Sequence, residues 1–202
     1  MRETKTKARG QMRPFTKADV GVIREKLSRR GNSRDVALFE TAISSMLRAS
    51  DLLALKVGDV TDRGAVVESF TARQKKSGKP VPVYLSVAAR TALAAHIAEH
   101  RLSNAAFLFR RGDRAGRLSQ APLSTTSYRT LVKTFADLAG YTDTAKFSGH
   151  STRRTKAALL YRETKDIAGV RTLLGHTSLA HTAAYLGVGR DEALALAARI
   201  EI

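Results

Sequence analysis

LLGHTSLAHTAAYL, residues 173–186, indicates the fold most clearly, because it places a histidine at a predicted turn and a tyrosine in the helix that follows. The preceding residues, 164–174, have helical apolar spacing and stop at Gly175, a usual helix C-cap. The residues from 178 to 186 predict another helix, which contains Tyr185. His176 therefore lies at the turn, and Tyr185 follows it by nine positions.

Two segments further out contain residues suited to phosphate chemistry. GHSTRRTKA supplies His150 and Arg153, and MLRASDLLALK supplies Arg48 with Asp51 three positions later. Phosphodiester exchange needs a nucleophile, cations around the non-bridging oxygens, and groups that move protons. Each residue alone has a structural explanation, since most arginines are solvated and most tyrosines pack at a surface. Together and in this order they favour a catalytic site.

The overall charge indicates a polyanionic partner. The chain has 202 residues, with 35 Lys and Arg against 18 Asp and Glu, a formal net charge of +17 and a pI of about 10.8. Each Lys or Arg that neutralises a phosphate releases counterions, so such a surface binds nucleic acid without reading its sequence. Nucleic acid is therefore the expected partner.

The same sequence disfavours several other classes of protein. No stretch approaches about 18 uninterrupted apolar residues, so no membrane partner is expected. The opening MRETKTKARGQMRPF lacks the apolar run of a signal peptide, and no cysteine is present for disulfides or thiolate catalysis. The histidines and carboxylates show no metal-ligand spacing. We expect a cytoplasmic, nucleoid-associated protein without metal or cofactor.

Periodicity and turn signals predict a mainly α fold with a small antiparallel β-sheet. The length suits one domain, which we place at residues 15–202 after a basic flexible arm at residues 1–14. The predicted helices cover 16–31, 33–47 with Ser33 as cap, a short segment at 50–60 with Ser50 as cap, 86–100, 124–139, 150–164, 164–174, 178–186 and 190–200. The predicted strands cover 65–74 and 81–86, around the turn KKSGKP, and 107–111.

The order of these motifs resembles the signature of the tyrosine recombinases, the phage integrase family. The matching elements are Arg48 with an acidic residue three positions later, His150-x-x-Arg153, and Leu-Leu-Gly-His176 with Tyr185 nine positions on. Several short patterns in the right order are far more specific than one. The resemblance covers residue 15 to about residue 200. It implies the catalytic-domain fold of that family and a site-specific DNA recombinase.

The resemblance implies a role for each position. Tyr185 would attack the scissile phosphate, giving a 3′-phosphotyrosyl enzyme and a free 5′-hydroxyl. Arg48 and Arg153 would hold the non-bridging oxygens, a task suited to planar and permanently charged guanidinium groups. His150 would move the proton of the tyrosine, and His176 would hydrogen-bond the phosphate and order the site. ATP and Mg²⁺ would not be needed, because the phosphotyrosine keeps the bond energy.

The turn QKKSGKP resembles the β-hairpin that carries the family's lysine, the general acid for the departing 5′-oxygen. Lys76 is the better match and the adjacent Lys75 is the alternative, while both could instead contact backbone phosphates. Asp51 is expected to orient Arg48 through a charge-assisted hydrogen bond.

Two features depart from the pattern of the family. Members usually have a glycine shortly before the first arginine, where this chain has Ser45 and Met46, so the backbone leading to Arg48 is expected to differ. Most members also have a separate N-terminal helical domain that closes around DNA, whereas only the short arm precedes the catalytic part here. The chain is therefore either a minimal recombinase, like the fimbrial-switch invertases, or a fragment.

Two other functions fit part of the sequence. Residues 164–186 also resemble a non-enzymatic helix-turn-helix DNA-binding protein, but this leaves Arg48 and Arg153 without a role. A type IB topoisomerase-like enzyme would use the same chemistry on a single duplex.

For a recombinase, the expected partners are double-stranded DNA, other copies of the chain in a tetramer, and accessory DNA-bending proteins. The helix predicted at 190–200 would then pack on a neighbouring subunit. The sequence does not specify the target site or the choice among integration, inversion and resolution.

Overall fold

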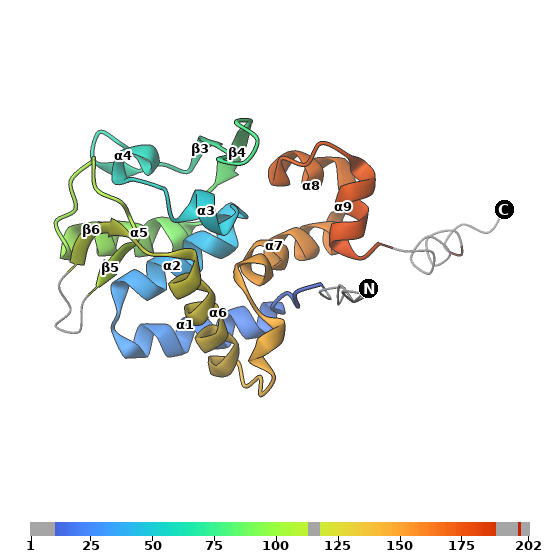
Figure 1. The fold of residues 1–202 in the computed structure, drawn as a ribbon, viewed down its shortest axis with the longest axis horizontal. Coiled ribbons are helices and arrows are strands. Elements are labelled where there is room, and N and C mark those ends of the chain that lie inside the picture. Colours follow the sequence, from blue (N-terminus) through green and yellow to red (C-terminus); the bar gives the residue numbers. More distant parts are fainter. Residues whose placement is uncertain (1–10, 113–117, 189–197, 199–202) are drawn as a thin grey trace, which may run out of the picture.

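The computed structural model describes residues 11–112, 118–188 and 198, and this part of the chain is mainly helical (Figure 1). Its helices are α1 (Lys17–Arg30), α2 (Ser33–Ser45), α3 (Ala49–Leu52), α4 (Val57–Val60), α5 (Val87–Glu99), α6 (Thr125–Leu138), α7 (Gly149–Thr164), α8 (Ile167–Leu174) and α9 (Leu179–Leu186), with a 3₁₀ turn at Thr144–Lys146. Of these helices, none is long and apolar enough to cross a membrane.

Local capping explains where the predicted helices begin and end. Thr16 and Asp19 form a capping box at the start of α1, and Gly31 ends it in the left-handed conformation, with φ of 68°. Two predicted caps are wrong. Asn32, not Ser33, accepts the hydrogen bond that caps α2, because its side-chain oxygen lies one residue ahead of the first turn. Ser50 lies inside α3, which begins at residue 49.

Within the described residues, the β structure consists of three separate antiparallel pairs instead of one sheet. The pairs are β1 (Thr61–Asp62) with β2 (Ala65–Val66), β3 (Ser69–Arg73) with β4 (Pro80–Tyr84), and β5 (Arg110–Gly112) with β6 (Leu118–Pro122). The predicted strand at 65–74 is divided because the Val67 N–H donates to the Val60 carbonyl, which turns the chain between β2 and β3. The hairpin predicted around KKSGKP is confirmed, with Ser69 opposite Tyr84.

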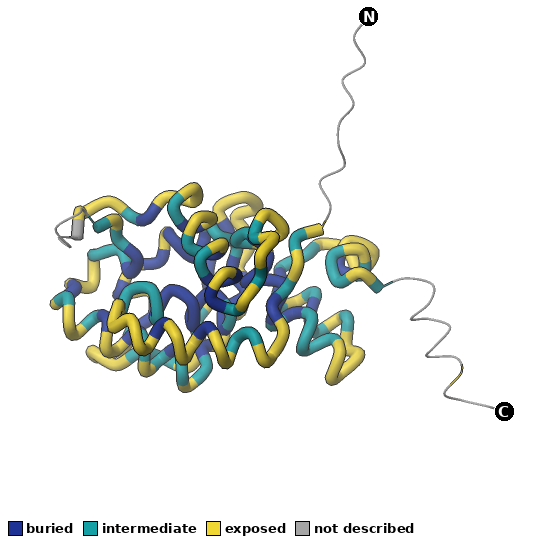
Figure 2. Tube along the Cα trace, turned by 90° about the horizontal axis from the view of Figure 1, so that it is seen from below, coloured by how far each residue is buried: buried dark blue, intermediate teal, exposed yellow. Residues whose placement is uncertain are grey.

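The α2 helix lies at the centre of the core. Leu38, Phe39 and Ala42 are almost fully buried, and the helix contacts α1, α5 and α7 on different sides. The ring of Phe39 meets Phe135 of α6 edge to face, with centroids 5.2 Å apart. Figure 2 shows the buried segments enclosed by outer helices that expose one side. The core therefore fixes the end of α2, from which the chain continues to Arg48.

Helices α7, α8 and α9 gather at one end of the molecule, opposite β5 and β6 (Figure 1). A smaller buried apolar cluster lies among them, formed by Met46, Ala157, Val170 and Leu174. The α9 helix itself buries only Thr182 completely. The helix that carries Tyr185 is thus held by a limited apolar contact.

The structure describes only part of the two terminal segments that the sequence analysis predicted. Of the predicted arm at residues 1–14, the structure describes residues 11–14. Arg13 donates its backbone N–H to the Lys146 carbonyl, and its guanidinium lies 4.6 Å from the Tyr141 ring centroid. Residues 1–10, and all of the helix predicted at 190–200 except residue 198, lie outside the described residues.

A buried histidine predicts how stability depends on pH. His96 has Nε2 2.9 Å from the Leu108 carbonyl and Nδ1 near the Ser33 hydroxyl, and burial lowers its pKa below the ordinary 6.5. The folded chain therefore favours neutral His96, so its contribution is present above about pH 6.5 and is lost as pH falls toward the folded pKa. Urea unfolding of the wild type should shift to lower midpoints from pH 7.5 to 5. The His96→Gln variant should show a smaller shift, and an equal shift would contradict this assignment.

Candidate active site

Arg153 of α7 connects the segments that carry the other site residues. It is 3% exposed, and its two terminal nitrogens donate to the Met46 carbonyl at 2.8 Å and the Leu174 carbonyl at 2.7 Å. These carbonyls end α2 and α8, two residues before Arg48 and His176 respectively. A guanidinium has five N–H donors, so three remain after both bonds. Arg153 therefore holds the site together and keeps donors for an anion.

The β3–β4 hairpin is tied to the same point. Gln74 donates from its side-chain amide to the Leu174 carbonyl at 3.1 Å, so this carbonyl accepts from both Gln74 and Arg153. Gly175 makes the approach possible, because a Cβ there would lie 2.4 Å from the Gln74 amide nitrogen and 2.6 Å from a Val81 methyl. Its φ of 61° also favours glycine. The glycine of the LLGH motif thus brings the hairpin against α8.

Asp51 does not bind Arg48, so the predicted role of Asp51 is wrong. Its Oδ1 accepts from the Lys75 backbone N–H at 3.0 Å and from the Ser50 hydroxyl at 3.3 Å. The reason is geometric, because Asp51 is buried inside α3, where the turn of the hairpin meets the helix. Asp51 therefore fixes the backbone of the turn that contains Lys75 and Lys76, whose side chains are exposed.

Arg48 lies between α2 and α3 and precedes the first residue of α3. Met46 ends α2 with φ of 52°, a left-handed conformation that glycine adopts more easily. The difference from the family pattern at Ser45 and Met46, where a glycine is usual, thus lies at the C-cap of α2. The Met46 side chain is 3% exposed and belongs to the small apolar cluster, so its burial compensates the backbone strain.

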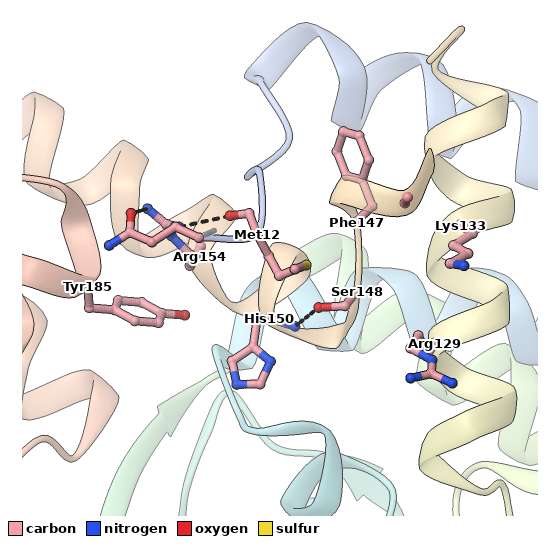
Figure 3. A pocket seen from close by; sticks show the side chains of 10 residues that line it. Met12, Arg129, Lys133, Phe147, Ser148, His150, Arg154 and Tyr185 are labelled. Carbon is pink, nitrogen blue, oxygen red and sulfur yellow. Dashed lines mark hydrogen bonds between the residues drawn. The ribbon is translucent and has the colours of Figure 1, made fainter. Parts of the chain in front are cut away.

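His150 lines a cleft at the start of α7. The cleft has a volume of about 610 Å³, and Tyr185, Arg154 and Ser148 also contribute to its walls (Figure 3). Ser148 caps α7 by accepting from the His150 backbone N–H, which sets the direction of the histidine. Burial lowers the pKa of His150, and the charges of nearby arginines lower it further. The ring is therefore a neutral proton acceptor near pH 7.

His176 faces both the arginines and the tyrosine. Burial lowers its pKa to about 4, and the charge of Arg153 adds to this effect. Thr182 donates its hydroxyl to the Ser178 carbonyl, so the contact of 3.2 Å between His176 Nδ1 and Thr182 Oγ1 needs the proton on Nδ1. The Nε2 atom is then unprotonated. The ring lies edge to face with Tyr185, with centroids 5.2 Å apart.

Tyr185 places its hydroxyl among positive charges. The ring points from α9 into the cleft, toward the region that contains His150 (Figure 3). Burial raises the pKa of Tyr185, while the charges of Arg153, Arg154 and Arg48 oppose that increase. The site therefore favours the phenolate relative to an equally buried tyrosine without these neighbours.

Unpartnered polar atoms are concentrated in this region. Within the described residues, six buried side-chain nitrogen or oxygen atoms have no hydrogen-bond partner. Four of them are Arg48 Nη1, Asp51 Oδ2, Arg154 Nε and Tyr185 Oη. Each such group costs about 1–3 kcal/mol, and native proteins retain them mainly where they have a function. The concentration of such atoms here makes this region the candidate functional site.

The structure brings five of the predicted residues together: Arg48, His150, Arg153, His176 and Tyr185. Lys76 lies on the hairpin tied to them. The sequence interpretation did not select Gln11, Gln74 or Arg154. Of these three residues, only Arg154 could have been selected from the sequence, because it directly follows Arg153. In the described ranges, no three His, Asp or Glu side chains are grouped as a metal site.

The fold and this arrangement define a class of protein. The structure is similar to the crystal structure of XerA recombinase, with a TM-score of 0.71 and 20% identity over 94% of this chain and 65% of that one. The fold is that of a tyrosine recombinase catalytic domain.

Sequence comparisons give the family. Residues 15–191 match the model of the phage integrase family, and the chain belongs to that family. Tyrosine recombinase XerC of Herpetosiphon aurantiacus is 29% identical over 166 residues, which are 80% of this chain and 50% of the relative. The probable integrase/recombinase YoeC of Bacillus subtilis is 26% identical over 160 residues, covering 79% and 81%. The chain spans about half the length of the XerC relative.

The junction at Gly175 leads to a stability prediction. Gly175→Ala should destabilise the fold by about 2–4 kcal/mol, because it adds left-handed strain and overpacking against Gln74 and Val81. Gly31→Ala is the matched control, since Gly31 has φ of 68° and no atom within 4 Å of the added Cβ. It should lose only about 1–2 kcal/mol. Urea unfolding measures both, and equal losses would show that the close approach is unimportant.

Proposed function

We propose that this chain is the catalytic part of a site-specific DNA recombinase that cleaves and rejoins strands through a 3′-phosphotyrosine at Tyr185. The observation that carries the proposal is the Tyr185 hydroxyl, buried beside the Arg153 guanidinium and near the charges of Arg48 and Arg154. A phosphodiester bound by these arginines would have its phosphorus atom next to the Tyr185 hydroxyl. Membership of the phage integrase family supports this chemistry.

In the proposed cleavage step, the Tyr185 oxygen forms a bond to phosphorus and the bond to the 5′-oxygen breaks. The Tyr185 proton passes to neutral His150, which lines the same cleft. Arg48 and the free N–H groups of Arg153 stabilise the charge on the non-bridging oxygens. Attack by a 5′-hydroxyl on the phosphotyrosine reverses the sequence and seals the strand.

His176 is proposed to change its protonation when DNA binds. With the Thr182 hydroxyl donating to the Ser178 carbonyl, the matching tautomer of His176 has its proton on Nδ1 and leaves Nε2 as an acceptor. A bound phosphate brings negative charge beside the ring and raises its pKa, so that Nε2 can acquire a proton. It then donates to a non-bridging oxygen, as the resemblance to the family implies.

Lys76 is proposed as the general acid that protonates the departing 5′-oxygen, with Lys75 as the alternative. The support is the position of the hairpin turn, which Asp51 and Gln74 tie to α3 and α8 beside the arginines. Lys75 already uses its backbone N–H in this attachment, while both ammonium groups are exposed.

Double-stranded DNA is the proposed substrate, and the charge of +17 supports it. Arg129 and Lys133 lie one turn apart on α6 and line the cleft with His150, so they are suited to phosphates beside the scissile one. Exchange between two duplexes requires four cleavages, so we propose four copies of the chain on paired sites.

Tyr185→Phe tests the nucleophile. It should abolish the covalent adduct but leave DNA affinity nearly unchanged, because only the attacking oxygen is removed. The protein is incubated with nicked suicide duplexes from DNA flanking its coding sequence, and adducts are separated on a denaturing gel. Tyr161→Phe, on α7, is the matched control and should still form the adduct. An adduct formed by Tyr185→Phe would overturn the assignment.

The same adduct assay, together with plasmid relaxation, distinguishes recombination by the wild-type protein from the two alternative functions. A helix-turn-helix protein would bind DNA but form no adduct with any duplex. A type IB topoisomerase-like enzyme would relax plasmids that lack a special site. A recombinase should form adducts only at its own sites.

Lys76→Ala should slow cleavage about 10²–10⁴-fold, because general acid catalysis contributes that range. A substrate with sulfur at the 5′-bridging position has a better leaving group and should restore cleavage by this variant. Arg48→Ala is the control, since its proposed role is at the non-bridging oxygens and sulfur should not rescue it. Single-turnover cleavage rates measure each case. Rescue of Lys75→Ala in place of Lys76→Ala would transfer the role to Lys75.

A further inference from the structure

The segment before α1 crosses the helices that form the active site. We call residues 11–15 the strap. The Phe15 backbone N–H donates to the Thr155 hydroxyl on α7 at 3.0 Å, and the Phe15 ring stacks on Phe147 with centroids 4.9 Å apart. The strap is thus anchored at its end nearest α1, and residues 11 and 12 extend from that anchor along the wall of the cleft.

The strap meets Arg154 with two directed hydrogen bonds. Arg154 Nη1 donates to the Met12 carbonyl and Nη2 donates to Gln11 Oε1, both at 2.8 Å (Figure 3). Arg154 is only 8% exposed, and both of its terminal nitrogens are used in this way. The pair of bonds therefore orients the planar guanidinium.

Gln11 and Arg154 also reach the nucleophile helix. The Gln11 side-chain amide donates to the Ala184 carbonyl, one residue before Tyr185. The Arg154 guanidinium carbon lies 5.4 Å from the centroid of the Tyr185 ring, a cation–π distance. Since α9 buries only Thr182 completely, these polar contacts add to the packing of Tyr185 against the small apolar cluster and the His176 ring.

We propose that Arg154 is a positioning residue for Tyr185, and that residues 11 and 12 of the strap hold Arg154 and α9 together, so that the strap is part of the active site. This inference rests on the proposed function for its catalytic consequence. Arg153 donates hydrogen bonds to the ends of α2 and α8, whereas Arg154 donates hydrogen bonds to the strap. Adjacent arginines thus have separate tasks.

The charge of Arg154 acts with several neighbours. Tyr185 faces Arg153 and Arg154 on α7, Arg48 before α3, and the His176 ring after α8, while His150 shares its cleft. Removing one positive charge raises the pKa of Tyr185 and of His150, because Arg154 lowers both. The pH dependence of cleavage should therefore move upward whichever of the two groups controls it.

The test measures single-turnover cleavage of the nicked duplex from pH 6 to 9.5. Arg154→Met should lose about tenfold or more in rate at pH 7.5, and its half-maximal pH should rise. Arg154→Lys keeps the charge but loses the fork, so it should restore the half-maximal pH more than the rate. Gln11→Ala should lower the rate without moving the pH profile. Arg162→Met, an exposed arginine on the same helix, is the control for both readouts.

Amide hydrogen exchange of α9 gives a readout that does not require activity. Exchange at residues 183–186 should be faster in Gln11→Ala and Arg154→Met than in the wild type or Arg162→Met. If the wild type cleaves no DNA, the proposed function fails, and the exchange data alone decide whether the strap holds α9. Unchanged exchange in Gln11→Ala, or an unmoved pH profile in Arg154→Met, would overturn the inference.

Discussion

Arg153 donates to the carbonyls of Met46 and Leu174, and these two bonds set the distance between the end of α2 and the end of α8. Arg48 and His176 each lie two residues after one of these carbonyls, so their separation depends on the same guanidinium. A buried charge is tolerated only when its hydrogen bonds are made, which makes both bonds a condition of the fold. The group proposed to bind phosphate is therefore also the group that assembles its binding site.

The remaining attachments use backbone atoms in the same way. Gln74 shares the Leu174 carbonyl, Asp51 accepts from the Lys75 N–H, and Lys156 donates to the Ser44 carbonyl at 2.8 Å. Bonds to the backbone fix the path of the chain directly, whereas a side-chain pair fixes only two rotamers. The bonds of Gln74 and Asp51 therefore fix the positions of the hairpin, α3 and α8 relative to one another.

The sequence was sufficient for the long helices, the hairpin and five residues that lie near one another in the candidate site, because helical periodicity, glycine caps and motif order are local signals. It was insufficient for contacts between distant segments. Nothing near Asp51 indicates that its partner is the Lys75 backbone, and Gln11 lies in a stretch without periodicity. The division of the strand at 65–74 also depends on a distant carbonyl, at Val60. Arg154 was visible beside Arg153, but only the fold separates their surroundings.

Met46, which stands near the place of a glycine in the family motif, limits which segments of related proteins can be combined in a chimera. The pattern of the family has a glycine near this position, and glycine adopts the left-handed conformation more easily than other residues. Here the side chain fills space beneath α8 and α9, beside Ala157 and Val170. A chimera that received α2 and α3 from a glycine-containing relative would gain an easier turn but leave a cavity under α9. A working chimera would therefore have to take the turn at Met46 and helices α7 to α9 from the same protein.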